Sequence, residues 1–364
     1  MKKIKVLEVI GSMDMGGAET LLMNILKNIN INKFQLYFLC YGNKKFDYEE
    51  ELKKLGGIII KIPIPSFNIF QNIKQIKNVI ETNNIDIVHC HTYYNSMYAL
   101  IAAKKCGIKK RITHSHNTKS EEHANIIKKI YYLISKLIIN FYSTDFLACG
   151  SDAGKALFFK SKKFKIINNG IILSRFYYND IFRKEKMKEL KVPNNYKIIG
   201  HVGRFEEAKN HKFLIELFNN YLKEHKNTIL LLIGDGSLHK EIEQQIKKYK
   251  IENNVKLLSK RSDVNELYNV MDLFLFPSLY EGLPVVLIEA QANGVPIVAS
   301  DTIDKEVNFT DTISFLSLTE NYKCWIKEIE QKIGIRNDNR KLMEDSKYNI
   351  KNTVKQVEQL YSDL

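Results

Sequence analysis

The chain has few of the residues that mark a disulfide framework, a secretory signal or a membrane span. Its 364 residues include 5 Cys, 6 Pro and 1 Trp. The number of cysteines is odd, and most of them lie in apolar segments. Both features are typical of buried free thiols in a reducing cytosol. No segment approaches the roughly 18 uncharged apolar residues that cross a bilayer. Glu8 interrupts the first apolar stretch, and no signal cleavage site follows it. We therefore expect a cytoplasmic protein.

Acidic residues are scarce in the first half of the chain. Lys and Arg total 55 against 41 Asp and Glu, a formal charge of +14. Residues 1–175 hold 27 basic and 13 acidic side chains, so the whole excess lies there. This asymmetry suggests a polyanionic partner, either nucleic acid or an anionic membrane face. A compositional bias toward Lys, Ile and Asn is the alternative. Only seven Arg occur, without the interleaved aromatic residues typical of nucleic-acid binding, so we expect no nucleic-acid partner.

The length and the hydrophobic pattern predict two α/β domains. A chain of this length suits two domains at roughly 100–200 residues each, and 45% hydrophobic residues exclude disorder. Apolar runs alternate with segments of helical period, which predicts parallel sheets that bind ligands at the carboxyl ends of their strands. The linker is expected at 168–180, and a terminal helical segment, 341–363, is expected to pack across the first domain. The predicted strands are 3–10, 34–40, 58–63, 86–91, 111–116, 146–150, 196–204, 228–236, 254–259, 272–278 and 296–300.

The most informative segment runs from 277 to 300, PSLYEGLPVVLIEAQANGVPIVAS. It predicts a strand, a loop, a helix with Pro284 in its first turn and Gly294 at its end, and another strand. The free amides at the helix start would bind an anion such as a diphosphate. Glu281 in the loop and Glu289 on the helix could accept hydrogen bonds from sugar and ribose hydroxyls. Solvated carboxylates at a helix N-terminus are the alternative.

This segment resembles the signature of the family-4 glycosyltransferases, which are retaining enzymes of the GT-B fold, and the rest of the chain agrees with that family. The resemblance implies two doubly wound Rossmann-like domains facing a cleft. The first, acceptor-binding domain would span 1–172 together with a C-terminal helix, about 346–364, that packs back on it. The second, which binds the nucleotide sugar, would span 173–345.

The resemblance also assigns donor-binding residues. HVGRFEEAKN matches the family segment in which an Arg and a Lys hold the donor diphosphate, here Arg204 and Lys209. Arg261 would border the nucleobase. Glu281 would hold hydroxyls of the transferred sugar, and Glu289 those of the ribose. The loop that meets the phosphates would comprise Gly282, Leu283, Pro284 and Val285.

In the first half, the strand-to-helix loop GSMDMGGAET has neither Gly-x-Gly-x-x-Gly nor Gly-Lys-Ser/Thr, so it predicts no dinucleotide or Walker motif. By resemblance, Gly16 and Gly17 would let the backbone approach the donor phosphate.

Two His-x-His pairs stand at the ends of predicted strands: His89 with His91, and His114 with His116. Such pairs can bind zinc or begin a binuclear hydrolase site. Against a metal site, no Asp-x-Asp, His-x-x-x-His or Cys-x-x-Cys accompanies them. By resemblance His116 is the active-site histidine, and a role for His114 stays open. One of these two is expected to point into the sheet.

The acceptor site is the least defined. His91, Tyr93 and Asn95 are expected to line it, and His114 is a further candidate. The segment 121–143 predicts a Lys-bearing amphipathic helix, either an interfacial element or an ordinary packed crossover helix.

Together these features imply a metal-independent retaining glycosyltransferase that needs no cofactor. It would move a hexose or N-acetylhexosamine from a nucleotide sugar, for which we expect a UDP-sugar, to a saccharide or polyprenyl-linked acceptor. This transfer would belong to capsule or exopolysaccharide synthesis and would take place on the inner face of an anionic membrane. A nucleotide-sugar epimerase of the same fold and a metal-dependent hydrolase that uses the His pairs are the alternatives.

Overall fold

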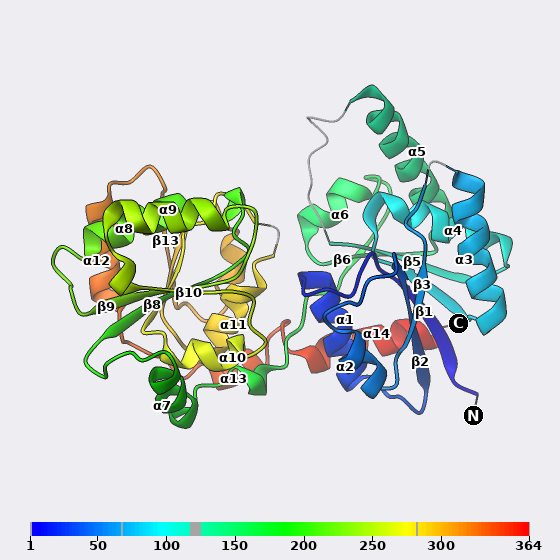
Figure 1. Cartoon of the computed structure of the whole chain (residues 1–364). Coiled ribbons are helices and arrows are strands. Elements are labelled where there is room, and N and C mark those ends of the chain that lie inside the picture. Colours follow the sequence, from blue (N-terminus) through cyan, green and yellow to red (C-terminus); the bar gives the residue numbers. More distant parts are fainter. Residues whose placement is uncertain (1, 67, 117–124, 282, 364) are drawn as a thin grey trace. The chain divides into compact units, whose positions relative to one another are not determined.

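The computed structural model describes residues 2–66, 68–116, 125–281 and 283–363. The chain forms two compact units, Met1–Ile171 with Ile350–Leu364 and Ile172–Asn349. Each unit is a parallel sheet with helices on both of its faces (Figure 1). The division lies one residue before the predicted boundary at 172 and about four residues after the one at 345.

The sheet of the first unit has the strand order β3-β2-β1-β4-β5-β6-β7, and all neighbours are parallel. Its strands are β1 (Ile4–Val9), β2 (Phe34–Tyr41), β3 (Ile58–Ile62), β4 (Ile87–Cys90), β5 (Lys110–Ser115), β6 (Asp145–Ala148) and β7 (Lys165–Ile166). Its helices are α1 (Gly17–Asn28), α2 (Glu49–Lys54), α3 (Ile69–Asn83), α4 (Ser96–Lys105), α5 (Ile126–Tyr142), α6 (Ser151–Leu157) and α14 (Ile350–Ser362).

The sheet of the second unit has the order β10-β9-β8-β11-β12-β13 and is also parallel throughout. Its strands are β8 (Lys197–Val202), β9 (Thr228–Ile233), β10 (Val255–Leu258), β11 (Leu273–Phe276), β12 (Ile297–Ser300) and β13 (Ile313–Leu316). Its helices are α7 (Asp180–Glu189), α8 (His211–Tyr221), α9 (His239–Tyr249), α10 (Val264–Leu267), α11 (Val285–Asn293), α12 (Tyr322–Lys332) and α13 (Arg340–Glu344).

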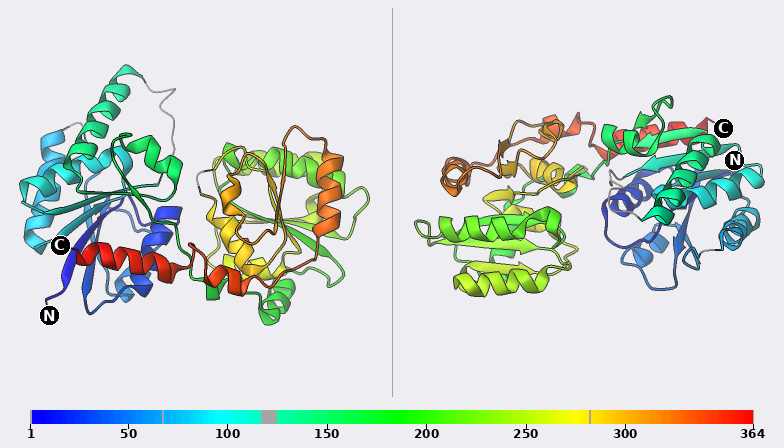
Figure 2. Two further views of the ribbon diagram at one scale, coloured as in Figure 1. Left: turned by 180° about the vertical axis from the view of Figure 1, so that it is seen from behind. Right: turned by 90° about the horizontal axis from the view of Figure 1, so that it is seen from above.

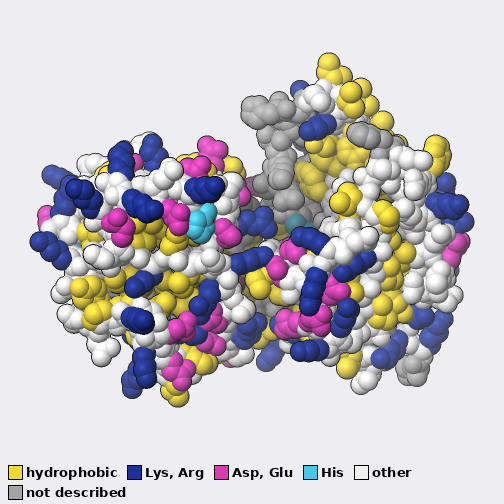
Figure 3. Space-filling view, viewed as in Figure 1, with side chains coloured by type: hydrophobic (Ala, Val, Ile, Leu, Met, Phe, Trp, Pro, Cys, Tyr) yellow, Lys and Arg dark blue, Asp and Glu magenta, His cyan; other side chains and the backbone are white. Residues whose placement is uncertain are grey.

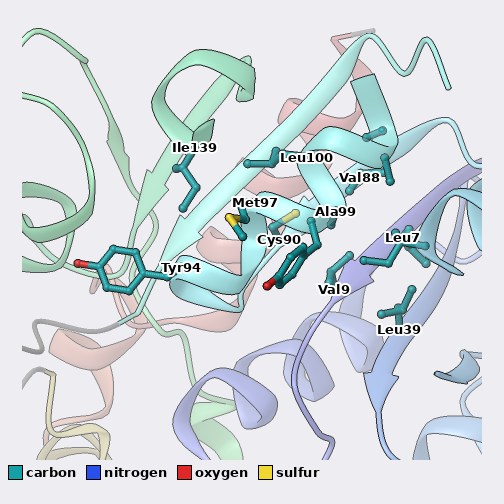
Figure 4. Close-up of a cluster of buried hydrophobic side chains, with 14 of the residues drawn as sticks. Leu7, Val9, Leu39, Val88, Cys90, Tyr94, Met97, Ala99, Leu100 and Ile139 are labelled. Carbon is teal, nitrogen blue, oxygen red and sulfur yellow. The ribbon is translucent and has the colours of Figure 1, made fainter. Parts of the chain in front are cut away.

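Burial of both sheet faces explains why the strands are apolar along their whole length. In the first unit, β1 contributes Leu7 and Val9 to a core that α4 covers with Met97 and Leu100 (Figure 4). None of these four side chains is more than 2% exposed. Helices fit on both faces because parallel strands need crossover connections.

Every predicted strand is present, and the predicted doubly wound fold is confirmed. Two strands were missed, β7 and β13. The terminal segment expected as one helix is two, α13 and α14. The second of these packs against α1 and lies alongside the first unit in both views of Figure 2. There the Asn30 amide donates to Glu358 at 2.7 Å.

The two strand orders place ligand sites at defined points. A doubly wound sheet opens a crevice where its strand order reverses, at the carboxyl ends of the two central strands. These strands are β1 and β4 in the first unit and β8 and β11 in the second. The loops that follow them contain most of the predicted site residues.

Candidate active site

In the second unit, the loops after β8 and β11 bring two predicted donor residues together. Lys209 follows β8, Glu281 follows β11, and their side chains form an ion pair although 72 residues separate them. Both are largely buried, at 15% and 14% exposure. The Lys209 ammonium also lies 4.9 Å from the ring centre of Phe276, a cation–π arrangement. Arg204 is exposed and has no ion-pair partner within the described ranges of the chain.

The helix α11 begins at Val285, directly after Pro284. The predicted helix is therefore present, with Pro284 as its N-cap rather than inside its first turn. No described side chain caps this end, and the Leu287 amide donates to the Pro284 carbonyl at 2.9 Å, so the amides before Leu287 are the ones that an anion could meet. Leu283 precedes the cap, and Gly282 lies outside the described residues. Gly294 ends α11 with φ of 79°, a conformation that favours glycine.

Glu289 lies on α11, one turn beyond its start. The Tyr268 hydroxyl is 3.0 Å from its Oε2 and can donate to it. The residue is partly exposed, whereas its carboxyl group lies deep among protein atoms. Desolvation raises the pKa of Glu289 to about 7, against the opposing effects of Tyr268 and Arg175. A carboxylic acid whose pKa lies near neutrality responds to ligand binding, as functional acids often do.

Arg261 is engaged by carboxylates of its own unit. Its Nε donates to Asp263 at 2.7 Å, and its Nη2 lies 2.6 Å from both Asp263 and Glu189. A contact with the nucleobase therefore stays a prediction, and it would have to use the remaining Nη1.

In the first unit, α1 starts at Gly17, and Gly16 caps it without a side-chain hydrogen bond. A Cβ built on Gly17 would meet nothing within 4 Å. The glycine therefore leaves open space beside the free amides of α1, as close approach of a phosphate requires.

The four histidines of the two His-x-His pairs form one cluster. The rings of His89 and His91 are 4.2 Å apart between centroids, and those of His114 and His116 are 4.1 Å apart. The prediction that one of the second pair points the other way is wrong, because the His114 and His116 rings stack on each other with 30° between their planes. His91 is 7% exposed and His114 2%, so direct contact of either with an acceptor remains a prediction.

Glu8 and Tyr361 complete this cluster, and the sequence analysis missed both. Glu8 of β1 is fully buried, and Tyr361 of α14 donates to its Oε1 at 2.6 Å. His91 contacts its Oε2 through Nε2 at 2.9 Å. Burial opposes ionisation of Glu8, but the neighbouring His89 and His91 outweigh it and hold the pKa of Glu8 well below its usual range. A carboxylate inside the otherwise apolar strand KVLEVI was the signal available.

Ring nitrogens of His89, His91 and His114 lie within 4.8 Å of one another, close enough for a metal ion to bridge them. His91 and His89 also face Glu8, which is how carboxylates orient metal-bound histidines. The geometry thus leaves the metal alternative to experiment.

The predicted acceptor residues Tyr93 and Asn95 lie in a short 3₁₀ turn after β4. Tyr93 has φ of 51°, an uncommon conformation for a residue other than glycine. The Asn95 side chain accepts a hydrogen bond from the Tyr131 hydroxyl of α5 at 2.5 Å. This contact ties the turn to α5.

The helix α5 carries a row of exposed apolar side chains, which Figure 3 shows gathered over it. Ile126 is 77% exposed, Leu133 62% and Phe141 72%. The row repeats with helical period and consists of Ile126, Ile127, Ile130, Leu133, Ile134, Leu137 and Phe141. The helix is therefore packed on one side and uncovered on the other. Residues 121–124 of the predicted helix lie outside the described residues. In the described part of the chain, no helix has the length and apolar character of a membrane span.

Comparison with known proteins identifies the family. Residues 182–314 match the family model "Glycosyl transferases group 1", and residues 15–175 match "Glycosyltransferase Family 4". The chain is 36% identical to the putative glycosyltransferase EpsF of Bacillus subtilis over 332 residues, covering 89% of this chain and 86% of that one. It is 28% identical to the capsular polysaccharide biosynthesis glycosyltransferase CapH of Staphylococcus aureus, covering 98% of each chain. Anabaena HepE, solved with UDP and glucose, has the same fold, with a TM-score of 0.82, 20% identity and coverage of 99% of this chain and 100% of that one. The chain is therefore a group 1, family-4 glycosyltransferase of the GT-B fold.

Proposed function

We propose that the protein transfers a hexose or N-acetylhexosamine, with retention at the anomeric carbon, from a UDP-sugar to a saccharide or polyprenyl-linked acceptor of capsule or exopolysaccharide synthesis. Two comparisons support the substrates. The relative CapH is named for capsular polysaccharide biosynthesis, and HepE was solved with UDP and glucose.

One observation carries the proposal. Lys209 and Glu281 form an ion pair next to the start of α11, beyond the carboxyl ends of β8 and β11, where the strand order of the second sheet reverses. A leaving diphosphate needs positive charge. Lys209, the exposed Arg204 and the uncapped α11 amides supply it, so we propose that no metal ion or other cofactor takes part.

Lys209 and Glu281 neutralise each other in this structure. We propose that donor binding draws the Lys209 ammonium onto the diphosphate, which releases the Glu281 carboxylate to accept hydrogen bonds from the transferred sugar. That carboxylate would also stabilise the oxocarbenium-like transition state. The incoming hydroxyl attacks from the side on which the diphosphate departs and passes its proton to that phosphate, and His116 contacts the sugar.

A panel of nucleotide sugars, scored for release of free nucleoside diphosphate with and without acceptor, tests this function. We expect Lys209→Ala and Glu281→Gln to lower kcat on the order of 100-fold or more while the melting temperature changes little. Lys212→Ala and Glu207→Gln, in the same segment, are the matched controls. Near-normal donor consumption by both site variants would refute the proposal. Interconversion of nucleotide sugars without acceptor would favour the epimerase.

We also propose that α5 docks the protein on an anionic membrane, where a polyprenyl-linked acceptor would be held. An apolar face with flanking cations inserts into the headgroup region of such a surface. Lys128 and Lys129 are exposed beside the apolar row. Phe159, which contacts Phe141 of α5 at 6.4 Å between ring centres, is followed at once by the basic segment 160–163.

Sedimentation with vesicles tests the membrane proposal. We expect binding to vesicles that contain anionic lipid and little binding to neutral ones, and loss of binding in the double variant Ile130→Glu/Leu133→Glu. Ile181→Glu, at a position 64% exposed on α7, is the matched control. Equal binding to both lipids, or unchanged binding by the double variant, would contradict the proposal.

A further inference from the structure

The buried cluster of the first unit contains a carboxylate, Glu8, whose ion-pair and side-chain hydrogen-bond partners among the described residues are imidazoles and a phenol. Glu8 forms ion-pair contacts with His89 and His91, and no Lys or Arg of the described chain lies within ion-pair distance of it. Since a carboxylate accepts hydrogen bonds and donates none, each of its contacts fixes a proton on the partner.

The proton of His89 follows first. Tyr361 has one hydroxyl proton and gives it to Glu8 at 2.6 Å. The 2.6 Å contact between Tyr361 and Nδ1 of His89 must then use a proton on that nitrogen. In neutral His89 the other nitrogen, Nε2, carries only a lone pair, and it has no hydrogen-bond partner in the described part of the chain.

The same reasoning extends to His116. His91 donates from Nε2 to Glu8, so in its neutral form His91 has a bare Nδ1. His91 is buried, and its ring centre lies 4.2 Å from that of His89 and 5.4 Å from that of His114, so a second proton would place positive charge among buried imidazoles and the neutral form is favoured. The 2.9 Å contact between Nδ1 of His91 and Nε2 of His116 must then use a proton on His116.

The result accounts for every proton along this chain of contacts. His116 keeps its proton on Nε2, and its Nδ1 carries a lone pair that has no partner among the described residues. Unpaired acceptors are tolerated inside proteins better than unpaired N–H groups. This favours His116 protonated on Nε2 over His116 protonated on Nδ1.

We propose that Glu8 and His91 are positioning residues that fix His116 in the tautomer protonated on Nε2, which leaves Nδ1 as the ring nitrogen that can accept a hydrogen bond. Tyr361 anchors Glu8 from α14, so the last helix of the chain supports the active-site histidine. This inference rests on the proposed function only in giving His116 a part in transfer.

Long-range ¹H–¹⁵N spectra of the full chain, labelled at its nine histidines, test the tautomer directly. We expect His91 and His116 to be protonated on Nε2 alone at pH 7.5. His201, whose Nδ1 lies 2.9 Å from the Leu275 carbonyl, is an internal reference for the opposite tautomer. A His116 protonated on Nδ1, or a mixture of both tautomers, would overturn the proposal.

Glu8→Gln tests the consequence, because an amide can donate to His91 and so releases the constraint. We expect His116 to become mixed or reversed in tautomer and kcat to fall on the order of 10- to 100-fold, as when a group that orients a functional histidine is removed. The KM for the donor should stay within about twofold, because Lys209, Glu281 and the start of α11, which are proposed to hold the diphosphate, lie in the second unit. The titratable groups around His116 are Glu8, His89, His91 and His114.

Two variants separate positioning from stability. Thr113→Val, on β5, removes the buried hydrogen bond between the Thr113 and Ser143 hydroxyls and should lower the melting temperature without changing the His116 tautomer or kcat. Tyr361→Phe keeps the ring packed 5.9 Å from Phe34, and His116 should stay protonated on Nε2. A fall in kcat that follows melting temperature across all three variants would contradict a positioning role. Full transfer by His116→Gln would instead refute the proposed role of His116 and leave the tautomer assignment standing.

Discussion

Glu289→Gln should weaken donor binding and stabilise the ligand-free protein. Desolvation raises the pKa of Glu289 from an ordinary value of 4.5 to about 7. If the Glu289 carboxylate must accept hydrogen bonds from the ribose hydroxyls, the donor binds only the protein in which Glu289 is ionised. Donor affinity should then fall about 10-fold between pH 8 and pH 6, because each pH unit below the pKa costs about 1.4 kcal/mol.

The effect on stability has the opposite sign. Because the folded-state pKa lies above the ordinary one, folding favours the protonated acid. That contribution is complete below about pH 4.5 and is lost as the pH rises through about 7. The loss corresponds to about 3 kcal/mol at pH 8. A neutral Gln escapes it, so Glu289→Gln should raise the melting temperature at pH 8 and leave it nearly unchanged at pH 4.5.

Calorimetric titration with an intact UDP-sugar, rather than UDP, measures the first effect, because the diphosphate diester keeps its charge from pH 6 to 8. His211 lies beside Lys209, but burial and that Lys lower its pKa to about 4, so it does not titrate in this range. The affinity of Glu289→Gln should be weak and independent of pH. A wild-type affinity that is flat from pH 6 to 8, or a Glu289→Gln variant less stable at pH 8 than the wild type, would refute the reasoning.

Three further predictions concern fold and metal. Gly294→Ala should destabilise the protein by about 2 kcal/mol or more, measured by thermal melting, because φ is 79° and the new Cβ would lie 1.9 Å from the Asn337 carbonyl oxygen. Leu360→Ala should cost about 2–5 kcal/mol, since this α14 side chain is 5% exposed, whereas Leu342→Ala, at 52% exposure, should cost little. Dialysis against EDTA should leave nucleotide release unchanged. The contrary result would be one equivalent of zinc in the purified protein that is lost, together with activity, in a His89→Gln variant. That result would favour a metal site at the histidine cluster.

Local sequence signals were sufficient for the sheets and for locating the loops that carry most of the predicted donor residues. Continuous apolar runs marked the central strands, and Glu281 and Lys209 lie at the ends of strands that the pattern located. What the pattern could not show is that these two side chains pair, because that depends on which strands are neighbours. β7 was missed since it has only two residues, both exposed, and β13 since polar residues flank its four-residue run.

The buried cluster of the first unit was beyond local signals. Tyr361 and Glu8 are 353 positions apart and meet because α14 returns to the first unit. The expectation that the last segment crosses that unit was sufficient to place the helix there. It did not say which of its side chains would reach the sheet.

The two buried carboxylates show how partners decide what such a group can do. Both Glu8 and Glu289 lie near the switch point of their own sheet, and burial opposes ionisation of both. Glu8 is surrounded by imidazoles, which can carry positive charge, so its pKa is lowered and it stays an acceptor across the physiological range. Glu289 has the neutral Tyr268 hydroxyl as its close partner, and its pKa rises to about 7. A carboxylate that stays ionised can fix the tautomer of a histidine, but its protonation does not change when a ligand binds. A carboxyl group with a pKa near 7 can lose its proton when a ligand with donor hydroxyls binds to it. We therefore propose that the first unit uses its carboxylate to orient a residue and that the second uses its own to bind the donor.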